Sequence, residues 1–123
     1  MDKNEFKIVF RKPKYPVFVV SDERLFPAFS VKQLAISCLS STPIADKSYI
    51  QVIDSTGEEF WYSPDQYALS PGFAFKRWTK KRVVETFNSS SNAVELMQEY
   101  SMKSLSNKKI DRIIRDICEL LRS

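Results

Sequence analysis

The spacing of the apolar residues changes near Thr79, and this change most constrains how a chain of 123 residues like this one can fold. Before Thr79, apolar side chains occur in short runs rich in β-branched and aromatic residues, a pattern typical of strands. After Thr79, they recur every three or four residues, as they do on one face of a helix. Strands followed by helices, without regular alternation, predict a single α+β domain over 1–123.

Five runs before Thr79 are predicted as strands: 5–10, 16–20, 48–53, 58–62 and 72–78. The first two, EFKIVF and PVFVV, flank a short connection with a proline near each end and form a candidate hairpin. The last, GFAFKRW, follows a Pro-Gly pair that is typical of turns. We expect an antiparallel sheet, which could curl into a small, partly open barrel, with residues 1–78 mainly β.

The clearest hairpin joins 48–53 to 58–62 through the sequence DSTG. Asp54 can accept hydrogen bonds from the amides of this turn, and Gly57 can adopt a positive φ without steric cost. Apolar residues alternate onto both faces of the first arm, so we expect both faces of the hairpin to be covered.

Cap signals predict the helices. Ser30 can cap a helix near 30–40, within the β-rich half, and Thr79 can cap the first helix of the helical region 79–123. Asn92 followed by Glu95 matches a capping box, which predicts a second helix there. Helical spacing places Val94, Met97 and either Tyr100 or Ser101 on the buried face of that helix. With the tail, the region after Thr79 should hold two or three helices.

The tail NKKIDRIIRDICELLRS (107–123) has the clearest helical pattern in the chain. Its apolar stripe consists of Ile110, Ile113, Ile114, Ile117, Leu120 and Leu121. Such a stripe either packs on the sheet of its own domain or on another chain. The sequence therefore allows a monomer or a homodimer through the C-terminal helix.

Two cysteines, Cys38 and Cys118, lie far apart in apolar surroundings, and we interpret both as reduced core residues; a disulfide between them is the alternative. The first residues lack the apolar run of a secretory signal, and no run approaches the roughly 20 apolar residues of a membrane span. These features predict a cytoplasmic protein without a membrane partner.

The composition excludes several catalytic mechanisms. The chain has no histidine, which removes the commonest general base and the commonest metal ligand. Its two glycines are too few for a phosphate-binding loop or a dinucleotide fingerprint, and its two cysteines match no zinc spacing. We therefore expect neither an enzyme nor a bound cofactor or metal.

Acidic residues cluster at the tip of the predicted hairpin: Asp54, Glu58 and Glu59. Paired carboxylates can share a proton or hold a divalent cation. The plainer interpretation is that Asp54 shapes the turn and that the two glutamates are solvated. Cys38 could be a nucleophile, but no cation adjoins it closely enough to activate a thiolate, which favours core packing.

The strongest positive signal is GFAFKRWTKKR (72–82), where cationic residues interleave with aromatic ones. The candidate binding residues are Lys76, Arg77, Trp78, Lys80, Lys81 and Arg82. Cations bind phosphates, and an aromatic face can stack on an unpaired base. The alternative is a solvated run of charges whose aromatic residues belong to the core.

The sequence is compatible with two functions. The absence of catalytic equipment and the segregated charge favour a non-catalytic protein-binding module that acts as a regulator, inhibitor or immunity-type protein. Its partner would be another protein, which the sequence does not identify. The alternative is a protein that binds single-stranded RNA or DNA through 72–82, an idea that the sequence pI of about 9.1 supports.

Overall fold

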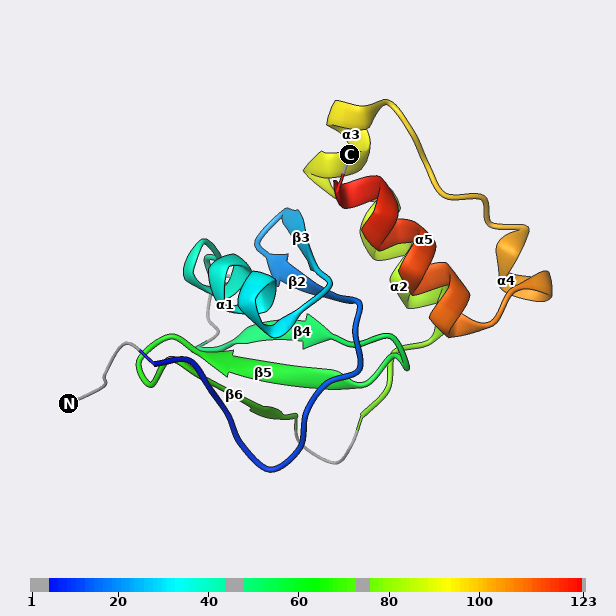
Figure 1. The fold of residues 1–123 in the computed structure, drawn as a ribbon. Coiled ribbons are helices and arrows are strands. Elements are labelled where there is room, and N and C mark those ends of the chain that lie inside the picture. The colour runs from blue at the N-terminus through cyan, green and yellow to red at the C-terminus, as the bar shows by residue number, and fades with distance from the viewer. Residues whose placement is uncertain (1–4, 44–47, 73–75, 123) are drawn as a thin grey trace.

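The computed structural model describes residues 5–43, 48–72 and 76–122. In these residues, six strands form one sheet in the order β1-β6-β5-β4-β2-β3 (Figure 1). The strands are β1 (Lys7–Ile8), β2 (Val17–Ser21), β3 (Arg24–Ala28), β4 (Ile50–Ile53), β5 (Glu59–Ser63) and β6 (Ala68–Pro71). The helices are α1 (Val31–Leu39), α2 (Lys80–Asn88), α3 (Ser91–Leu96), α4 (Ser104–Asn107) and α5 (Ile110–Arg122).

The predicted α+β class is confirmed, but the sheet is mixed rather than purely antiparallel. β1 runs parallel to β6, with Lys7 opposite Ala68, whereas every other pair of strands is antiparallel. The sheet is also not closed into a barrel, because β1 and β3 stand at its two ends. β1 does not lie beside β2, the next strand in the chain. It lies at the opposite edge of the sheet, where it pairs with β6.

The hairpin expected between 5–10 and 16–20 is therefore wrong. The connection between them is held at the tip of the β4–β5 hairpin, where the backbone amide of Lys14 donates to the Asp54 carboxylate at 3.0 Å. The carbonyl of Lys14 in turn accepts from the Ser55 amide at 2.9 Å. β2 instead forms a hairpin with β3 through a turn at Asp22, whose φ is 55°.

The hairpin through DSTG is confirmed. Gly57 has a φ of 89°, in the left-handed region that favours glycine. Both faces of the hairpin are covered, because Val52 belongs to one buried cluster and Ile53 to the other. The strand expected over 72–78 is replaced by β6, and residues 73–75 lie outside the described part. Arg77 makes only an isolated bridge to Glu58.

Two of the predicted helix caps are confirmed. The Ser30 hydroxyl accepts from the Gln33 amide at 3.2 Å, and the Thr79 hydroxyl accepts from the Arg82 amide at 3.1 Å. After Thr79, the described residues hold two long helices, α2 and α5, which agrees with the two or three helices expected, and two short helical segments, α3 and the single turn α4. The helix expected at Asn92 begins one residue earlier, with Ser90 as its cap.

Helices cover both faces of the sheet. α1 packs on one face through Leu34 and Cys38, and α2 and α5 pack on the opposite face. The buried residues of α5 are Ile113, Ile114, Ile117 and Cys118. The predicted tail stripe thus packs on its own domain, and a homodimer through α5 would have to use another face of that helix.

The two cysteines lie in the two separate buried layers and are unpaired, as the reduced interpretation predicted. Burial raises the pKa of Cys38 to about 12, which leaves almost no thiolate near neutral pH. In the part of the chain that the structure describes, no helix has both the length and the apolar character needed to span a bilayer.

Candidate functional site

The predicted basic segment lies where β6 leads into α2. Lys76, Arg77, Lys81 and Arg82 are exposed. Lys80 is half-buried, and its Nζ donates to the carbonyl of Leu105 at 3.3 Å. The cationic side chains of the segment are therefore available at the surface, apart from the tethered Lys80.

Trp78, the aromatic residue of the segment, is buried. Only 4% of its surface is exposed, and its indole Nε1 donates to Glu59 at 2.8 Å. The guanidinium of Arg82 lies 3.9 Å from the centre of the ring, and Phe18 meets the ring edge-on. Base stacking on Trp78 would require this ring to leave the core.

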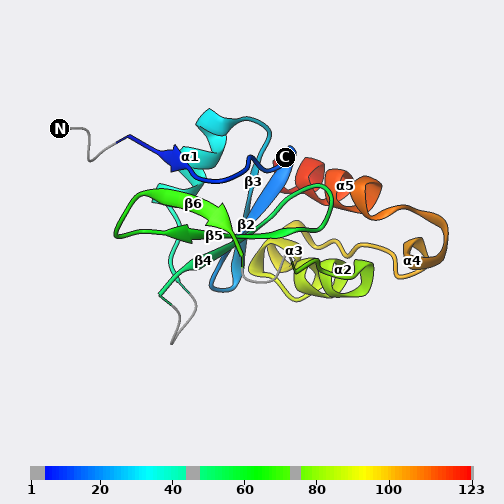
Figure 2. The same cartoon turned by 90° about the horizontal axis from the view of Figure 1, so that it is seen from below.

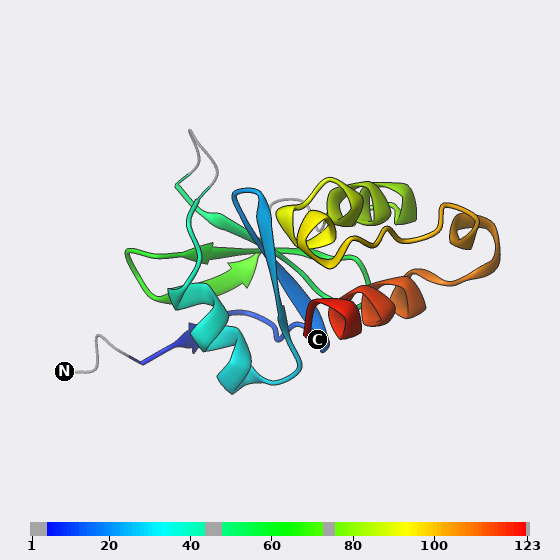
Figure 3. The same cartoon turned by 90° about the horizontal axis from the view of Figure 1, so that it is seen from above.

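Folding brings further cations to the same place. α2 and α5 run side by side in the same direction, and α4 lies at the end where both begin (Figures 2 and 3). A Cβ on Gly57 would stand 3.2 Å from the Trp78 carbonyl and 2.7 Å from Ile110, so the two helix starts converge on one turn. We call the exposed cations there the basic end: Arg77, Lys81, Lys103 and Lys109.

The three carboxylates at the tip of the hairpin have separate partners. Asp54 shapes the turn, as expected, since it accepts from the amides of Thr56 at 2.9 Å and Glu58 at 3.1 Å. The two glutamates are buried rather than solvated. Glu58 is ion-paired with Arg11, and Glu59 faces the indole groups. Each of the three carboxylates therefore has a structural role of its own.

Glu59 is held by two tryptophans. One carboxylate oxygen accepts from Trp61 Nε1 at 2.6 Å, and the other accepts from Trp78 Nε1 at 2.8 Å. Burial alone would raise the pKa of Glu59, but hydrogen bonds from both indoles and Gln51, with the nearby Arg82 charge, lower it below its ordinary value. The side chain is therefore a buried anion that fixes Trp78 in the core.

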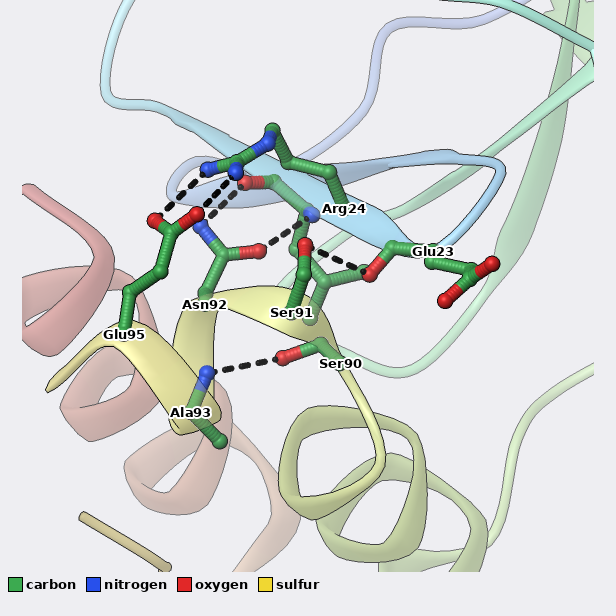
Figure 4. Close-up of polar contacts among 8 residues, drawn as sticks. Glu23, Arg24, Ser90, Ser91, Asn92, Ala93 and Glu95 are labelled. Carbon is green, nitrogen blue, oxygen red and sulfur yellow. Dashed lines mark hydrogen bonds and ion pairs between the residues drawn. The ribbon is translucent and has the colours of Figure 1, made fainter. Parts of the chain in front are cut away.

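One edge of the sheet is sealed by α3 (Figure 4). The Asn92 amide accepts from the Leu25 N–H at 2.7 Å and donates to the Leu25 carbonyl at 3.2 Å. The amide of Ser91 donates to the Glu23 carbonyl at 2.8 Å. These contacts satisfy the outward backbone groups that an edge strand would otherwise present to another chain.

The rest of the β3 edge is sealed from α1. The hydroxyl of Ser37 donates to the Pro27 carbonyl at 3.3 Å, and the Phe29 amide donates to Gln33 Oε1 at 2.7 Å. Pro27 itself has no amide hydrogen to offer. Another chain therefore cannot extend the sheet along β3 without displacing these side chains.

The polar contacts of α3 turn its apolar side chains outward. Arg24 holds Glu95 against β3, with Nη1 3.1 Å from Oε1, and only Ala93 of this helix enters the core. Val94 is 73% exposed and Met97 is 92% exposed, so their predicted burial is wrong. We call Val94, Leu96 and Met97 the α3 surface.

Sequence reasoning missed the α3 surface because helical spacing identifies which residues share a face but not which face meets the core. The signal that could have revealed it is the polar run Ser91-Asn92 together with Glu95. These side chains can bind the backbone groups of an edge strand that have no partner within the sheet. That match could be recognised only once β3 was known to be an edge.

Comparison with known proteins adds no relative, since no protein-family model, no curated protein and no solved structure matches the chain.

Proposed function

We propose that this chain is a non-catalytic protein-binding module that acts as a regulator, inhibitor or immunity-type protein, and that the α3 surface contacts its partner. The observation that carries this proposal is the orientation of α3. Burying a Val or Met side chain stabilises a protein by about 1.5–3 kcal/mol, and the fold forgoes this for Val94 and Met97. Val94 and Met97 line one hollow on the surface, and exposed apolar residues that lie together are typical of protein–protein interfaces.

The backbone at the end of α3 supports the same conclusion. Met97 closes the helix in the left-handed conformation with a φ of 53°, where glycine is the usual residue. The chain thus accepts a local conformational cost at a position whose side chain is almost fully exposed. A methionine that adapts its shape to an apolar surface suits an interface.

We place the module in the cytoplasm as a monomer. Its two buried cysteines are unpaired, as is usual in a reducing compartment. The apolar stripe of α5 is already used inside the domain. The α3 surface stays exposed in the single chain, and we assign it to a different protein.

Changing Val94 and Met97 to aspartate should abolish partner capture without unfolding the protein, because both side chains are exposed. The measurement is affinity capture from the organism that encodes the chain, with quantification of stoichiometric proteins by mass spectrometry. The matched control is Ile36→Asp on α1, which is 58% exposed and should leave capture unchanged. Equal capture by the double variant would refute the α3 surface as the contact.

The second candidate function is binding of single-stranded nucleic acid, and the basic end is the observation that favours it. Its cations lie at or just before the starts of α2, α4 and α5, beside the positive ends of α2 and α5. The buried Trp78 makes this candidate the weaker one, because the ring provides no open stacking face.

If nucleic acid is the ligand, charge reversal at Lys81 and Lys109 will weaken binding to single-stranded RNA and DNA and reduce its salt dependence. Arg82 should be left intact, since it covers Trp78. Fluorescence anisotropy at several salt concentrations measures both quantities. Binding by the charge-reversed variant at wild-type strength would eliminate this candidate.

A further inference from the structure

The two edges of the sheet differ in how their backbone groups are satisfied. At the β3 edge, side chains of α3 and α1 bond the outward groups. At the other edge, the Lys7 amide donates at 3.1 Å to the carbonyl of Tyr67, just before β6, and the Val9 amide donates at 2.9 Å to the carbonyl of Leu69 in β6. The N–H and carbonyl of Ile8 therefore point away from the sheet, and no hydrogen bond among the described residues uses them.

An exposed aromatic residue, Phe10, lies just past the end of β1. Phe10 is 93% exposed, and its φ is 71°. The Arg11 amide donates across it to the Val9 carbonyl at 2.9 Å, which makes a γ-turn with a positive central φ, a rare and strained conformation for a bulky residue. The turn directs a large apolar side chain into solvent, where it contributes nothing to the core.

The neighbouring charges indicate what this edge would accept. Lys7 and Lys12 are exposed on either side of Phe10, while Arg11 is ion-paired with Glu58. Acidic side chains on an added strand would neutralise both lysines. A second copy of the chain would bring the same positive charges to the same place, and edge lysines are a common means of preventing such self-pairing.

We propose that the open edge of β1 binds an extended, acidic segment of a partner protein as an added strand, with Phe10 as the apolar anchor. Main-chain hydrogen bonds to Ile8 would supply affinity, and the lysines and Phe10 would supply selectivity. The inference rests on the proposed protein-binding function and names a contact separate from the α3 surface.

The test is an NMR titration of the full isotope-labelled chain with synthetic peptides of equal length. The first probe alternates valine and glutamate, the second replaces glutamate with lysine, and the third is the first with N-methylated backbone amides. We expect the first peptide alone to shift the signals of residues 7–12 and to slow hydrogen exchange at the Ile8 amide by about tenfold or more.

Phe10→Gly supplies the matching variant. Glycine relieves the positive φ, so the variant should be at least as stable as the wild type. It should nevertheless bind the first peptide about tenfold more weakly or worse, because exposed aromatic anchors dominate interface energies. Ile36→Ala, which also removes exposed apolar surface, should bind normally.

Several outcomes would overturn the inference: an unchanged exchange rate at Ile8, equal binding of the N-methylated peptide, or shifts confined to the basic end. If, in the absence of peptide, hydrogen exchange at the Ile8 amide slows as the protein concentration rises, a second copy of the chain binds the β1 edge. Partner capture that depends on Val94 and Met97 is measured separately. If partner capture does not depend on Val94 and Met97, but the first peptide still slows hydrogen exchange at the Ile8 amide, the α3 proposal is refuted. The proposal for the β1 edge then stands.

Discussion

Replacing Glu59 with alanine will lower the free energy of unfolding by about 2–4 kcal/mol, because a hydrogen bond to a charged group contributes about 1.5–3 kcal/mol. The carboxylate accepts from both Trp61 and Trp78, and without it the buried Trp78 N–H has no acceptor. Glu59→Gln will cost less than alanine, since the amide retains one acceptor oxygen but turns a donor toward the second indole. Urea unfolding measures both variants.

The effect of Glu59 depends on pH in a defined direction. The pKa of Glu59 is lowered in the folded protein, so its ionised form is stabilised by folding. That stability is fully present above the unfolded pKa and is lost as pH falls through the lowered folded pKa. The difference between wild type and Glu59→Gln should therefore be constant near neutral pH and shrink below about pH 4.

Trp61→Phe is the control for the Glu59 prediction. It removes the half-exposed donor and leaves the buried pair of Glu59 and Trp78 in place. Among the three variants, it should therefore lower the free energy of unfolding the least. A Glu59→Ala variant within about 0.5 kcal/mol of wild type, the range of ordinary surface changes, would contradict the structural role assigned to this carboxylate.

Replacing Asn92 with alanine will destabilise the protein by about 1–3 kcal/mol, because it leaves the N–H and carbonyl of Leu25 without partners. It should also expose the β3 edge and promote self-association, since an unsealed edge strand pairs readily with another chain. Urea unfolding and analytical ultracentrifugation measure these two effects.

Asn92→Asp separates the two hydrogen bonds of this contact. The carboxylate can still accept from the Leu25 amide but can no longer donate to the Leu25 carbonyl, so the loss should be intermediate. If the alanine variant kept wild-type stability and stayed monomeric, α3 would not be sealing the edge.

Local signals in the sequence predicted the local structure of this protein. Ser30 and Thr79 cap helices, and DSTG makes a hairpin, because each of these features depends on residues adjacent in the chain. The parallel contact of β1 with β6 joins segments about sixty residues apart, and no local pattern specifies such a pairing. β3 was missed because RLFPA contains a proline, which is tolerated only at an edge.

The candidate site was harder to predict for a related reason. The capping-box pattern of Asn92 and Glu95 is real in sequence, but both side chains are engaged by β3 instead. That tertiary contact rotates α3, and Val94 and Met97 face outward as a result. In the basic segment, four of the five cations are exposed and Trp78 lies in the core, which matches the alternative stated for this segment. The sequence did not indicate that Glu59 binds Trp78 or that Lys80 is tethered to Leu105.

The most direct test of the protein-binding account is the affinity of the captured partner for the Val94→Asp, Met97→Asp variant, measured by isothermal titration calorimetry. We expect binding to weaken by about thirtyfold or more, equivalent to the roughly 2 kcal/mol of an interface hot spot. The free energy of unfolding should stay within about 0.5 kcal/mol of wild type. Wild-type affinity in a folded double variant would contradict the account.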